Sequence, residues 1–261
     1  MDRRNRRFRP WLAALAIGLA AAASGPAVAV TPANATVPPY FPTRLSHLGP
    51  ARQVVVVTAS SWTTSYATLR TYREDSGGTW HAKFPAMRAR LGYHGFVRAG
   101  SRVQNSGKTP AATFRLPRAF GAAPDPGTVL PYRQFDDNDW WPYDPQHPRT
   151  YNVYQYRRTA GALWRRSWAE HLASYPDQYR YAVVIAFNLP RGLYSSGGQH
   201  FARYPADTRR GGGIFLHVNG TGATAGCVSV SRDHMREILR WLDPQLHPRI
   251  VMGPTSVITE M

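Results

Sequence analysis

The chain contains a single cysteine, Cys227, and a histidine, His217, stands ten residues before it. A thiol becomes a nucleophile when it loses its proton, and a neighbouring imidazole can take that proton and stabilise the thiolate. Gly226 directly precedes the cysteine. It lets the backbone approach closely, so that the Cys227 amide can hold a developing oxyanion. These residue types predict cysteine-dependent acyl transfer, with Cys227 as nucleophile and His217 as base.

A lone cysteine also has less reactive interpretations. One cysteine cannot form an internal disulfide, so by its type alone it is a buried inert thiol, an intermolecular cross-link or a reactive group. Nine histidines are present, and His234 and His247 compete with His217 as partners of the thiol. His94 is expected in a turn. His200 lies in a glycine-rich loop, where it either touches substrate or is an ordinary loop residue.

The local pattern indicates the elements that must position this pair. Residues 213–218 form an apolar stretch typical of a buried strand, and residues 228–230 begin a second one after a small, polar loop. A strand, a tight loop and a strand can bring the imidazole and the thiol to the same end of one sheet. Asn219 and Thr224 lie in that loop. They orient His217 or bind substrate, or they serve only as turn residues.

Elsewhere the sequence predicts mainly β structure with flanking helices. Short apolar runs separated by turn-forming residues between positions 76 and 150 indicate short strands and long loops. Two helices are expected, one over residues 162–174 and one from a Ser231 cap to Asp243. Further strands are expected in three apolar stretches, at 54–57, 181–187 and 249–252. The expected fold is one predominantly β domain with a few helices on its flank.

The first residues predict export from the cell. Five arginines within the first nine positions precede an apolar run and then Ala-Val-Ala, which is the order of a secretory signal peptide over residues 1–29. The paired Arg6 and Arg7 leave the twin-arginine and the general secretory routes both open. The apolar run is shorter than the ~20 residues that a membrane span needs, and no later run is longer, so no transmembrane helix is expected in the mature chain. Residues 30–50 are rich in proline and predict an extended linker.

The charge of the chain is strongly basic. Its 32 Lys and Arg outnumber 15 Asp and Glu, a formal net charge of +17, and +13 remains without the five Arg and one Asp of the predicted signal peptide. Such a surface attracts polyanions, which for an exported protein are anionic wall polymers and lipid headgroups rather than nucleic acid. Thirty of the basic residues are Arg. Because a GC-rich coding sequence explains the same bias, charge alone identifies no substrate.

An acidic cluster, Asp136, Asp137 and Asp139, stands beside Trp140 and Trp141. Clustered carboxylates can bind a metal, but the central Gly and terminal Glu of a calcium loop are missing, which favours a solvated loop. We therefore expect no metal site there. The two tryptophans are candidates to stack on sugar rings.

The segments around the Cys and His pair resemble a known family. Gly212–Val218 followed by Thr224–Val228 is similar to the active-site segment of the L,D-transpeptidase catalytic domain, also called the YkuD type. Gly107–Phe114 resembles that family's Gly-x-Thr-Pro-x-Gly-x-Phe strand and turn. Weaker similarity follows at 140–141, 151–152, 170–172 and in the strand from Tyr181. The resemblance covers residues 80–254, the expected core of one catalytic domain over 51–261, and implies a YkuD-type, β-sandwich-like fold.

The resemblance implies a cysteine acyltransferase that acts on peptidoglycan stem peptides in the cell wall. Cys227 attacks the bond between an L-centre and the following D-residue, releases D-alanine and becomes acylated. A side-chain amine of a second stem then takes the acyl group, which gives a 3→3 cross-link, or water takes it and the stem is only trimmed. On this basis His217 is base and then acid, and amides around Gly226 and Cys227 form the oxyanion site. No metal or organic cofactor is required.

The sequence departs from the family pattern at several positions. Ala225 stands where His or Lys is common, Ser229 stands where Arg or Asn is common, Val218 replaces a small residue, and the loop from His217 to the cysteine is short. The nucleophile and base are unchanged, but side chains that can position a stem carboxylate are missing. Three alternatives therefore stay open: an L,D-carboxypeptidase with the same site, a non-catalytic wall-binding protein, and a papain-like or NlpC-type peptidase, in which the histidine follows the cysteine.

Overall fold

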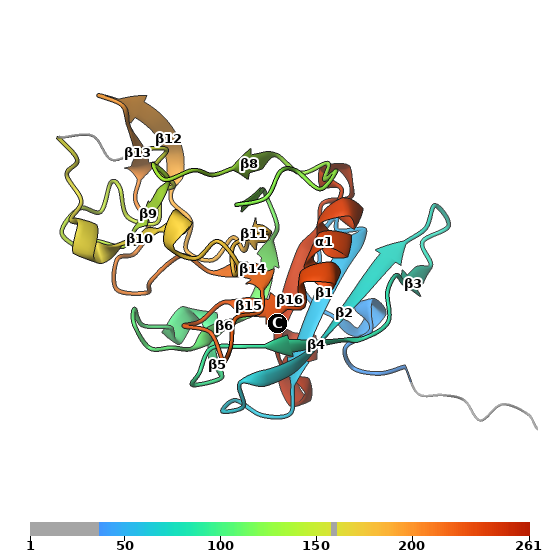
Figure 1. Ribbon diagram of the computed structural model, residues 1–261. Coiled ribbons are helices and arrows are strands. Elements are labelled where there is room, and N and C mark those ends of the chain that lie inside the picture. Colours follow the sequence, from blue (N-terminus) through green and yellow to red (C-terminus); the bar gives the residue numbers. More distant parts are fainter. Residues whose placement is uncertain (1–36, 158–160) are drawn as a thin grey trace, which may run out of the picture. The chain divides into compact units, whose positions relative to one another are not determined.

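Strands far apart in the sequence meet in one mixed β-sheet (Figure 1). The structure, a computed structural model, describes residues 37–157 and 161–261, so the predicted signal peptide of residues 1–29 lies outside the described residues. Within these ranges, twelve strands form the sheet in the order β5-β6-β16-β1-β2-β4-β15-β14-β11-β7-β8, with β3 paired to β2. Their bounds are β1 (Gln53–Ala59), β2 (Tyr66–Glu74), β3 (Trp80–Ala82), β4 (Met87–Arg90), β5 (Phe96–Arg98), β6 (Thr109–Arg115), β7 (Ala119–Gly121), β8 (Tyr132–Gln134), β11 (Ala182–Val184), β14 (Phe215–Val218), β15 (Val228–Val230) and β16 (Arg249–Pro254).

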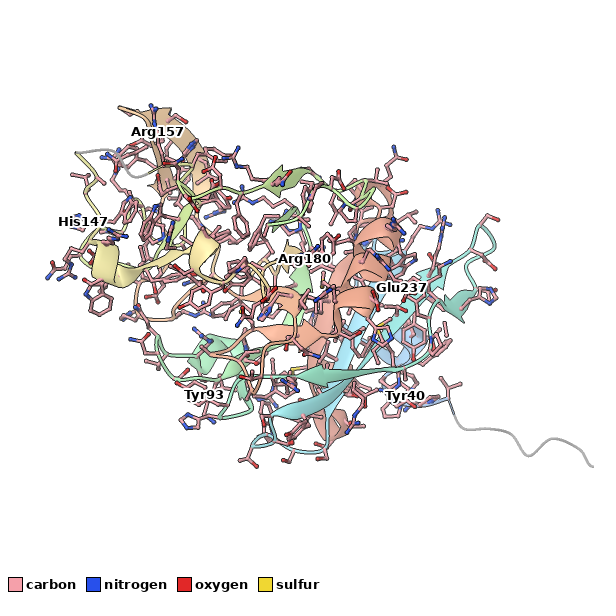
Figure 2. The ribbon with its side chains drawn as sticks, in the orientation of Figure 1. Tyr40, Tyr93, His147, Arg157, Arg180 and Glu237 are labelled. Carbon is pink, nitrogen blue, oxygen red and sulfur yellow. The ribbon has the colours of Figure 1, made fainter. Side chains whose placement is uncertain are left out.

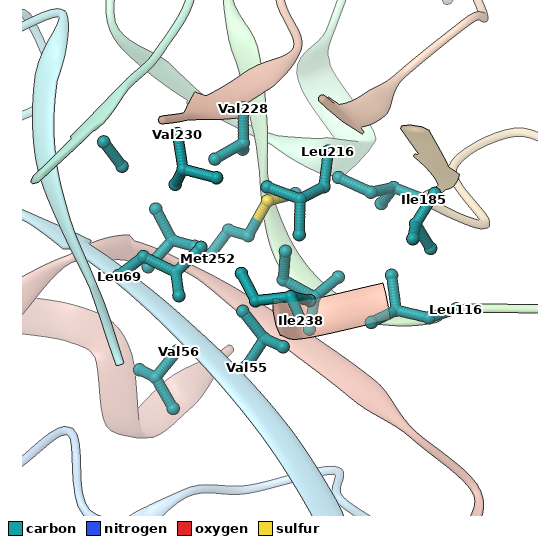
Figure 3. Close-up of a cluster of buried hydrophobic side chains, with 14 of the residues drawn as sticks. Val55, Val56, Leu69, Leu116, Ile185, Leu216, Val228, Val230, Ile238 and Met252 are labelled. Carbon is teal, nitrogen blue, oxygen red and sulfur yellow. The ribbon is translucent and has the colours of Figure 1, made fainter. Parts of the chain in front are cut away.

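The strand β1 lies at the centre of the sheet, parallel to β16 and antiparallel to β2. All seven of its residues are buried. A strand that is apolar on both faces must be covered on both faces. Figure 3 shows part of that cover, where Val55 of β1, Met252 of β16 and Ile238 belong to one buried cluster. The strands expected at 54–57 and 249–252 are confirmed as β1 and β16, and the one expected at 181–187 is present only in part, as β11.

The helix α1 (Arg232–Trp241) follows directly after β15. The Ser231 hydroxyl accepts a hydrogen bond from the His234 amide, and Asp233 lies in the first turn, where a negative charge favours the helix dipole. Met235, Ile238 and Leu239 are fully buried at helical spacing. The capped helix expected from the sequence is therefore confirmed, and it is the one α-helix in the described ranges.

The helix expected over residues 162–174 is wrong. That segment forms two 3-10 turns, η3 (Arg166–Trp168) and η4 (Leu172–Ser174), on either side of the short strand β10 (Ala169–His171). The strand pairs with β9 (Trp140–Pro142), and the backbone amide and guanidinium of Arg165 all bind the buried Asp144 carboxylate. These distant partners satisfy backbone groups that a helix would have paired internally, so the helical spacing of the apolar residues did not decide the structure.

Part of the expected linker is docked on the domain. Phe41 packs edge-on against Tyr72 of β2, with ring centroids 5.3 Å apart, and the guanidinium of Arg70 lies 3.9 Å above the Tyr40 ring. Figure 2 shows Tyr40 near the point where the described chain begins. The hydroxyl of Ser46 donates to the Thr259 carbonyl. Residues 37–50 therefore pack on the domain that was expected to begin at residue 51, because their aromatic side chains find an apolar surface that proline content does not reveal.

The remaining elements are short. The strands β12 and β13 form a separate two-stranded sheet. No helix in the described part of the chain is long and apolar enough to cross a membrane. The fold is mainly β with one flanking helix, as expected. The bounds not yet given are β12 (Arg191–Ser196), β13 (Gln199–Tyr204), η1 (Pro42–Arg44), η2 (Ala99–Ser101), η5 (Pro244–Leu246) and η6 (Thr255–Glu260).

Candidate active site

The strands β14 and β15 carry the predicted pair. They run parallel, with Leu216 opposite Val228 and His217 opposite Ser229. Cys227 directly precedes β15, so its position in register is opposite Phe215, two residues before His217. Side chains two apart on a strand share a face. Cys227 and His217 therefore lie on the same face of the sheet, one diagonal step apart, as the strand, loop and strand pattern predicted.

Both side chains line one pocket of about 630 Å³. This volume is in the range of small-molecule sites. The backbone of residues 211–213 and the loop of residues 220–225 form part of its wall. The side chains of Arg102, Tyr143, Glu170 and Tyr179 also line it. The sequence predicted the loop and the pair, but it did not predict these four side chains as neighbours of the thiol.

The Cys227 thiol is held between two backbone groups. Its Sγ lies 3.3 Å from the Gly213 carbonyl oxygen, to which it donates, and 3.3 Å from the Phe215 amide, which donates to it. Burial raises the pKa of the thiol to about 12, with a further rise from the Glu170 carboxylate, while the Phe215 amide and the Arg102 guanidinium lower it. The sulfur at rest is therefore a protonated thiol, and it needs a base to become a nucleophile.

The imidazole of His217 lines the same pocket as this thiol. Its Nδ1 lies 2.8 Å from the Val218 carbonyl oxygen, and because a carbonyl only accepts, Nδ1 carries the proton and Nε2 is left as the basic nitrogen. Burial lowers the pKa of His217 to about 4, although backbone hydrogen bonds with Val218 and Gln178 raise it. The ring is thus neutral near pH 7. Val218 stands in place of the family's small residue, but the hydrogen bond with His217 does not depend on that side chain, because the backbone carbonyl of Val218 makes it.

The backbone at Gly226 passes so close to Arg102 and Lys108 that a side chain would not fit there. Its φ is +139°, and a Cβ there would lie 3.0 Å from the Lys108 carbonyl oxygen. The Gly226 amide donates to the Thr224 hydroxyl, which in turn donates to the Cys227 carbonyl. Thr224 therefore braces the turn at the pocket wall, and the oxyanion role of the Cys227 amide stays a prediction.

Asn219 does not reach the pocket. Its side-chain amide lies 2.8 Å from the Ser229 hydroxyl, which ties the loop to β15. The orientation of His217 comes from the Val218 carbonyl instead. The expectation that Asn219 orients the histidine or binds substrate is thus not supported by its contacts, and its position is explained by the turn.

The other histidines lie away from the thiol. Among the described residues that line the pocket, His217 is the one histidine. His234 is on α1, His247 ends η5, His94 bonds the Ser106 carbonyl, and His200 pairs with Ser195. His217 is therefore the described histidine that shares a pocket with the thiol.

The acidic cluster and the tryptophans beside it are structural. Asp139 is fully buried, and both of its oxygens accept from the Arg133 guanidinium at 3.1 Å. Trp141 is fully buried, and His171 stacks on Trp140 with ring centroids 4.2 Å apart. Asp136 and Asp137 are exposed, as expected for a solvated loop, but Asp139 is not. The expectation of a sugar-stacking platform is wrong, because both tryptophans are buried against protein partners. The described residues contain no group of three or more His, Cys, Asp or Glu that could hold a metal ion.

The family model of the YkuD L,D-transpeptidase catalytic domain matches residues 54–258. The chain belongs to this family. No curated protein matches it. The activity of the L,D-transpeptidase family is on peptidoglycan. The match agrees with the mainly β fold that carries Cys227 and His217.

The L,D-transpeptidase site of this chain has a polar wall that sequence analysis missed. The Glu170 carboxylate accepts a hydrogen bond from the Tyr179 hydroxyl at 2.6 Å and from the Tyr143 hydroxyl at 3.1 Å. Burial raises the pKa of the carboxyl, and the two tyrosine hydrogen bonds oppose that rise. The Tyr179 ring also packs edge-on against the His217 ring, with centroids 5.4 Å apart. The weak family similarity at residues 170–172 was the available signal, but it did not indicate that the carboxylate lines the pocket of the thiol.

The side chain of Asn152 binds the backbone that forms part of the wall of the L,D-transpeptidase site. It is buried with φ +57°, and its Oδ1 accepts from Trp141 Nε1 at 2.8 Å and from the Gly213 amide at 2.9 Å. Its Nδ2 donates to the Asn188 carbonyl at 2.7 Å. The Gly213 carbonyl is the partner of the thiol. Asn152 therefore fixes the backbone that holds Cys227.

The substitution Asn152→Ala is expected to lower the free energy of unfolding by about 3 kcal/mol, because it leaves buried donors and an acceptor unpaired and puts a Cβ without a polar group at a left-handed backbone position. Urea unfolding followed by tryptophan fluorescence measures this. Asn138, which is exposed, supplies the control, since Asn138→Ala should change the free energy of unfolding by less than about 0.5 kcal/mol. If both variants lower the free energy of unfolding by the same small amount, Asn152 does not stabilise the backbone as described.

Proposed function

We propose that this protein is an exported L,D-transpeptidase that forms 3→3 cross-links between peptidoglycan stems through an acyl-enzyme on Cys227. The observation that carries the proposal is the placement of a protonated thiol and a neutral imidazole on one face of the sheet, in one pocket, with Nδ1 of His217 held by the Val218 carbonyl. This arrangement provides a nucleophile and a base of fixed tautomer.

In the first half of the proposed reaction, Nε2 of His217 takes the proton of the thiol, and the sulfur attacks the carbonyl carbon between the L-centre and the terminal D-residue. The Cys227 amide stabilises the negative oxygen. The imidazolium then gives its proton to the departing nitrogen as the carbon–nitrogen bond breaks. The products are a thioester on Cys227, free D-alanine and a neutral imidazole.

In the second half, an amine of another stem attacks the thioester carbon and passes a proton to Nε2 of His217. The carbon–sulfur bond breaks, and the proton returns to the sulfur, which restores the resting pair. Water in place of the amine gives a carboxylic acid, which is the carboxypeptidase outcome. The same two residues serve both acceptors, so the acceptor decides the product.

Product analysis tests the proposal. The mature wild-type protein is incubated with a disaccharide tetrapeptide, and the products are separated by liquid chromatography and weighed by mass spectrometry. We expect dimers that weigh two substrates less one D-alanine. Trimmed monomers without dimers would show a carboxypeptidase, and binding to sacculi without either product would show a wall-binding protein.

A further inference from the structure

Arg102 is a buried cation without a carboxylate partner. The residue lies between η2 and β6 and is 5% exposed. Its Nε donates to the Lys108 carbonyl at 2.9 Å, and its Nη1 donates to the Arg210 carbonyl at 2.6 Å. Both partners are neutral. None of the ion pairs in the described ranges includes Arg102.

The third nitrogen of the guanidinium lies at the active site. Nη2 of Arg102 has no hydrogen-bond partner among the described residues, and it lies 2.9 Å from the place that a Cβ on Gly226 would take. A Cβ on Gly211, whose φ is +80°, would meet Nη1. Two glycines thus make room for the guanidinium, which lines the same pocket as Cys227. The Arg102 side chain thus forms part of the pocket wall, and its Nη2 has no acceptor among the described residues.

A guanidinium in this position favours an anion. Burial lowers the pKa of Arg102, but arginine stays protonated in proteins, so a charge is held out of water. Its described neighbours are two carbonyl oxygens and the Phe187 ring, 5.4 Å from the guanidinium carbon, and none of them carries a negative charge. Planar guanidinium groups bind carboxylates strongly and with defined geometry. An incoming carboxylate would therefore satisfy both the free donor and the buried charge.

The donor stem of the proposed reaction carries a carboxylate at the matching place. The terminal carboxyl carbon is three bonds from the scissile carbonyl carbon, so the two lie within about 4 Å of each other. A stem whose scissile carbonyl reaches Sγ of Cys227 must bring its terminal carboxylate close to the same wall. Arg102 is a cation in that wall.

We infer that Arg102 binds the terminal carboxylate of the donor stem and restricts the enzyme to donors that end one residue after the scissile bond. The inference rests on the proposed function. It makes Arg102 a specificity residue, because a stem with one further residue moves the carboxylate away from the guanidinium, and an amidated stem removes the charge.

The test compares rates of acyl-enzyme formation, followed by intact-mass spectrometry, for a tetrapeptide acid and the same tetrapeptide with a C-terminal amide. Wild type should react with the acid at least about tenfold faster, since a hydrogen bond to a charged group is stronger than one to a neutral group. In Arg102→Gln the preference should vanish, and Arg102→Lys, which keeps the charge but not the fork, should retain part of it. Arg209→Gln, which removes an exposed arginine from the neighbouring segment, should keep the wild-type ratio.

The outcomes separate the two proposals. Adducts at equal rates from acid and amide in wild type would overturn the inference and leave the proposed function standing, and this comparison needs no variant to fold. Equal losses for both donors in Arg102→Gln would also overturn it, because they would show a structural role or a general effect on the thiol. No adduct from the acid in wild type would instead reject the proposed function.

Discussion

Replacing Cys227 with alanine is expected to abolish the acyl-enzyme and to lower turnover of a tetrapeptide donor by at least about 10⁴-fold, as for other nucleophiles of acyl transfer. The sulfur forms the bond to the acyl group, and no neighbouring side chain of the pocket offers a second thiol, since the chain has one cysteine. Intact-mass spectrometry after incubation with donor measures the adduct, and dimer formation measures turnover.

The single cysteine makes this experiment easy to control. Any thiol-specific label on the wild type must be on Cys227, so loss of iodoacetamide labelling confirms the variant, and donor that protects wild type from the label occupies the site. Cys227→Ala should fold, because it removes one sulfur atom and should change the free energy of unfolding by less than about 2 kcal/mol. An adduct of unchanged mass on this variant would show that another residue is the nucleophile.

Replacing His217 with alanine should lower acylation by about 10²- to 10⁴-fold and should change its pH dependence. In wild type the pKa of His217 is lowered to about 4, so protonation removes the base only in acid, and the rate should rise through that pH and then stay level to neutral pH. In His217→Ala the thiol must ionise unaided. Its pKa of about 12 predicts a rate that climbs with each unit of pH across the neutral range.

Acylation rates measured from acid to alkaline pH in both proteins test this prediction. His234→Ala is the matched control, since that histidine lies on α1 away from the pocket, and its profile should follow the wild type. A wild-type profile that rises with a pKa near 7 would mean that the imidazole is not desolvated as the structure shows. A His234 variant as defective as the His217 variant would remove His217 from its role as base.

The sequence predicted those parts of the site that depend on neighbours along the chain. His217 and Cys227 share a face because two apolar stretches and a short polar loop form adjacent strands. The capped helix α1 was predictable for the same reason, since Ser231 and His234 are three residues apart. In these segments, local preference and the final packing agree.

The parts that the sequence did not predict depend on partners that are distant along the chain. Arg165 binds Asp144, 21 residues away, and this contact with strand pairing replaced the expected helix. Arg102 is held by the Arg210 carbonyl, 108 residues away. Glu170 lines the pocket of the thiol from β10, which pairs with the distant strand β9. Periodicity reports which residues are apolar, but it contains no information about which polar groups meet across the fold.

The position of β16 has a consequence for the rate of folding. This strand, close to the end of the sequence, lies between β6 and β1, which is the first strand of the sheet in the sequence. Pairing of residues so far apart closes a very long loop, and domains with such connectivity fold slowly. The sheet stays open between β6 and β1 until β16 is in place, so synthesis must pass residue 254 before the buried cluster that β1 and β16 share can form.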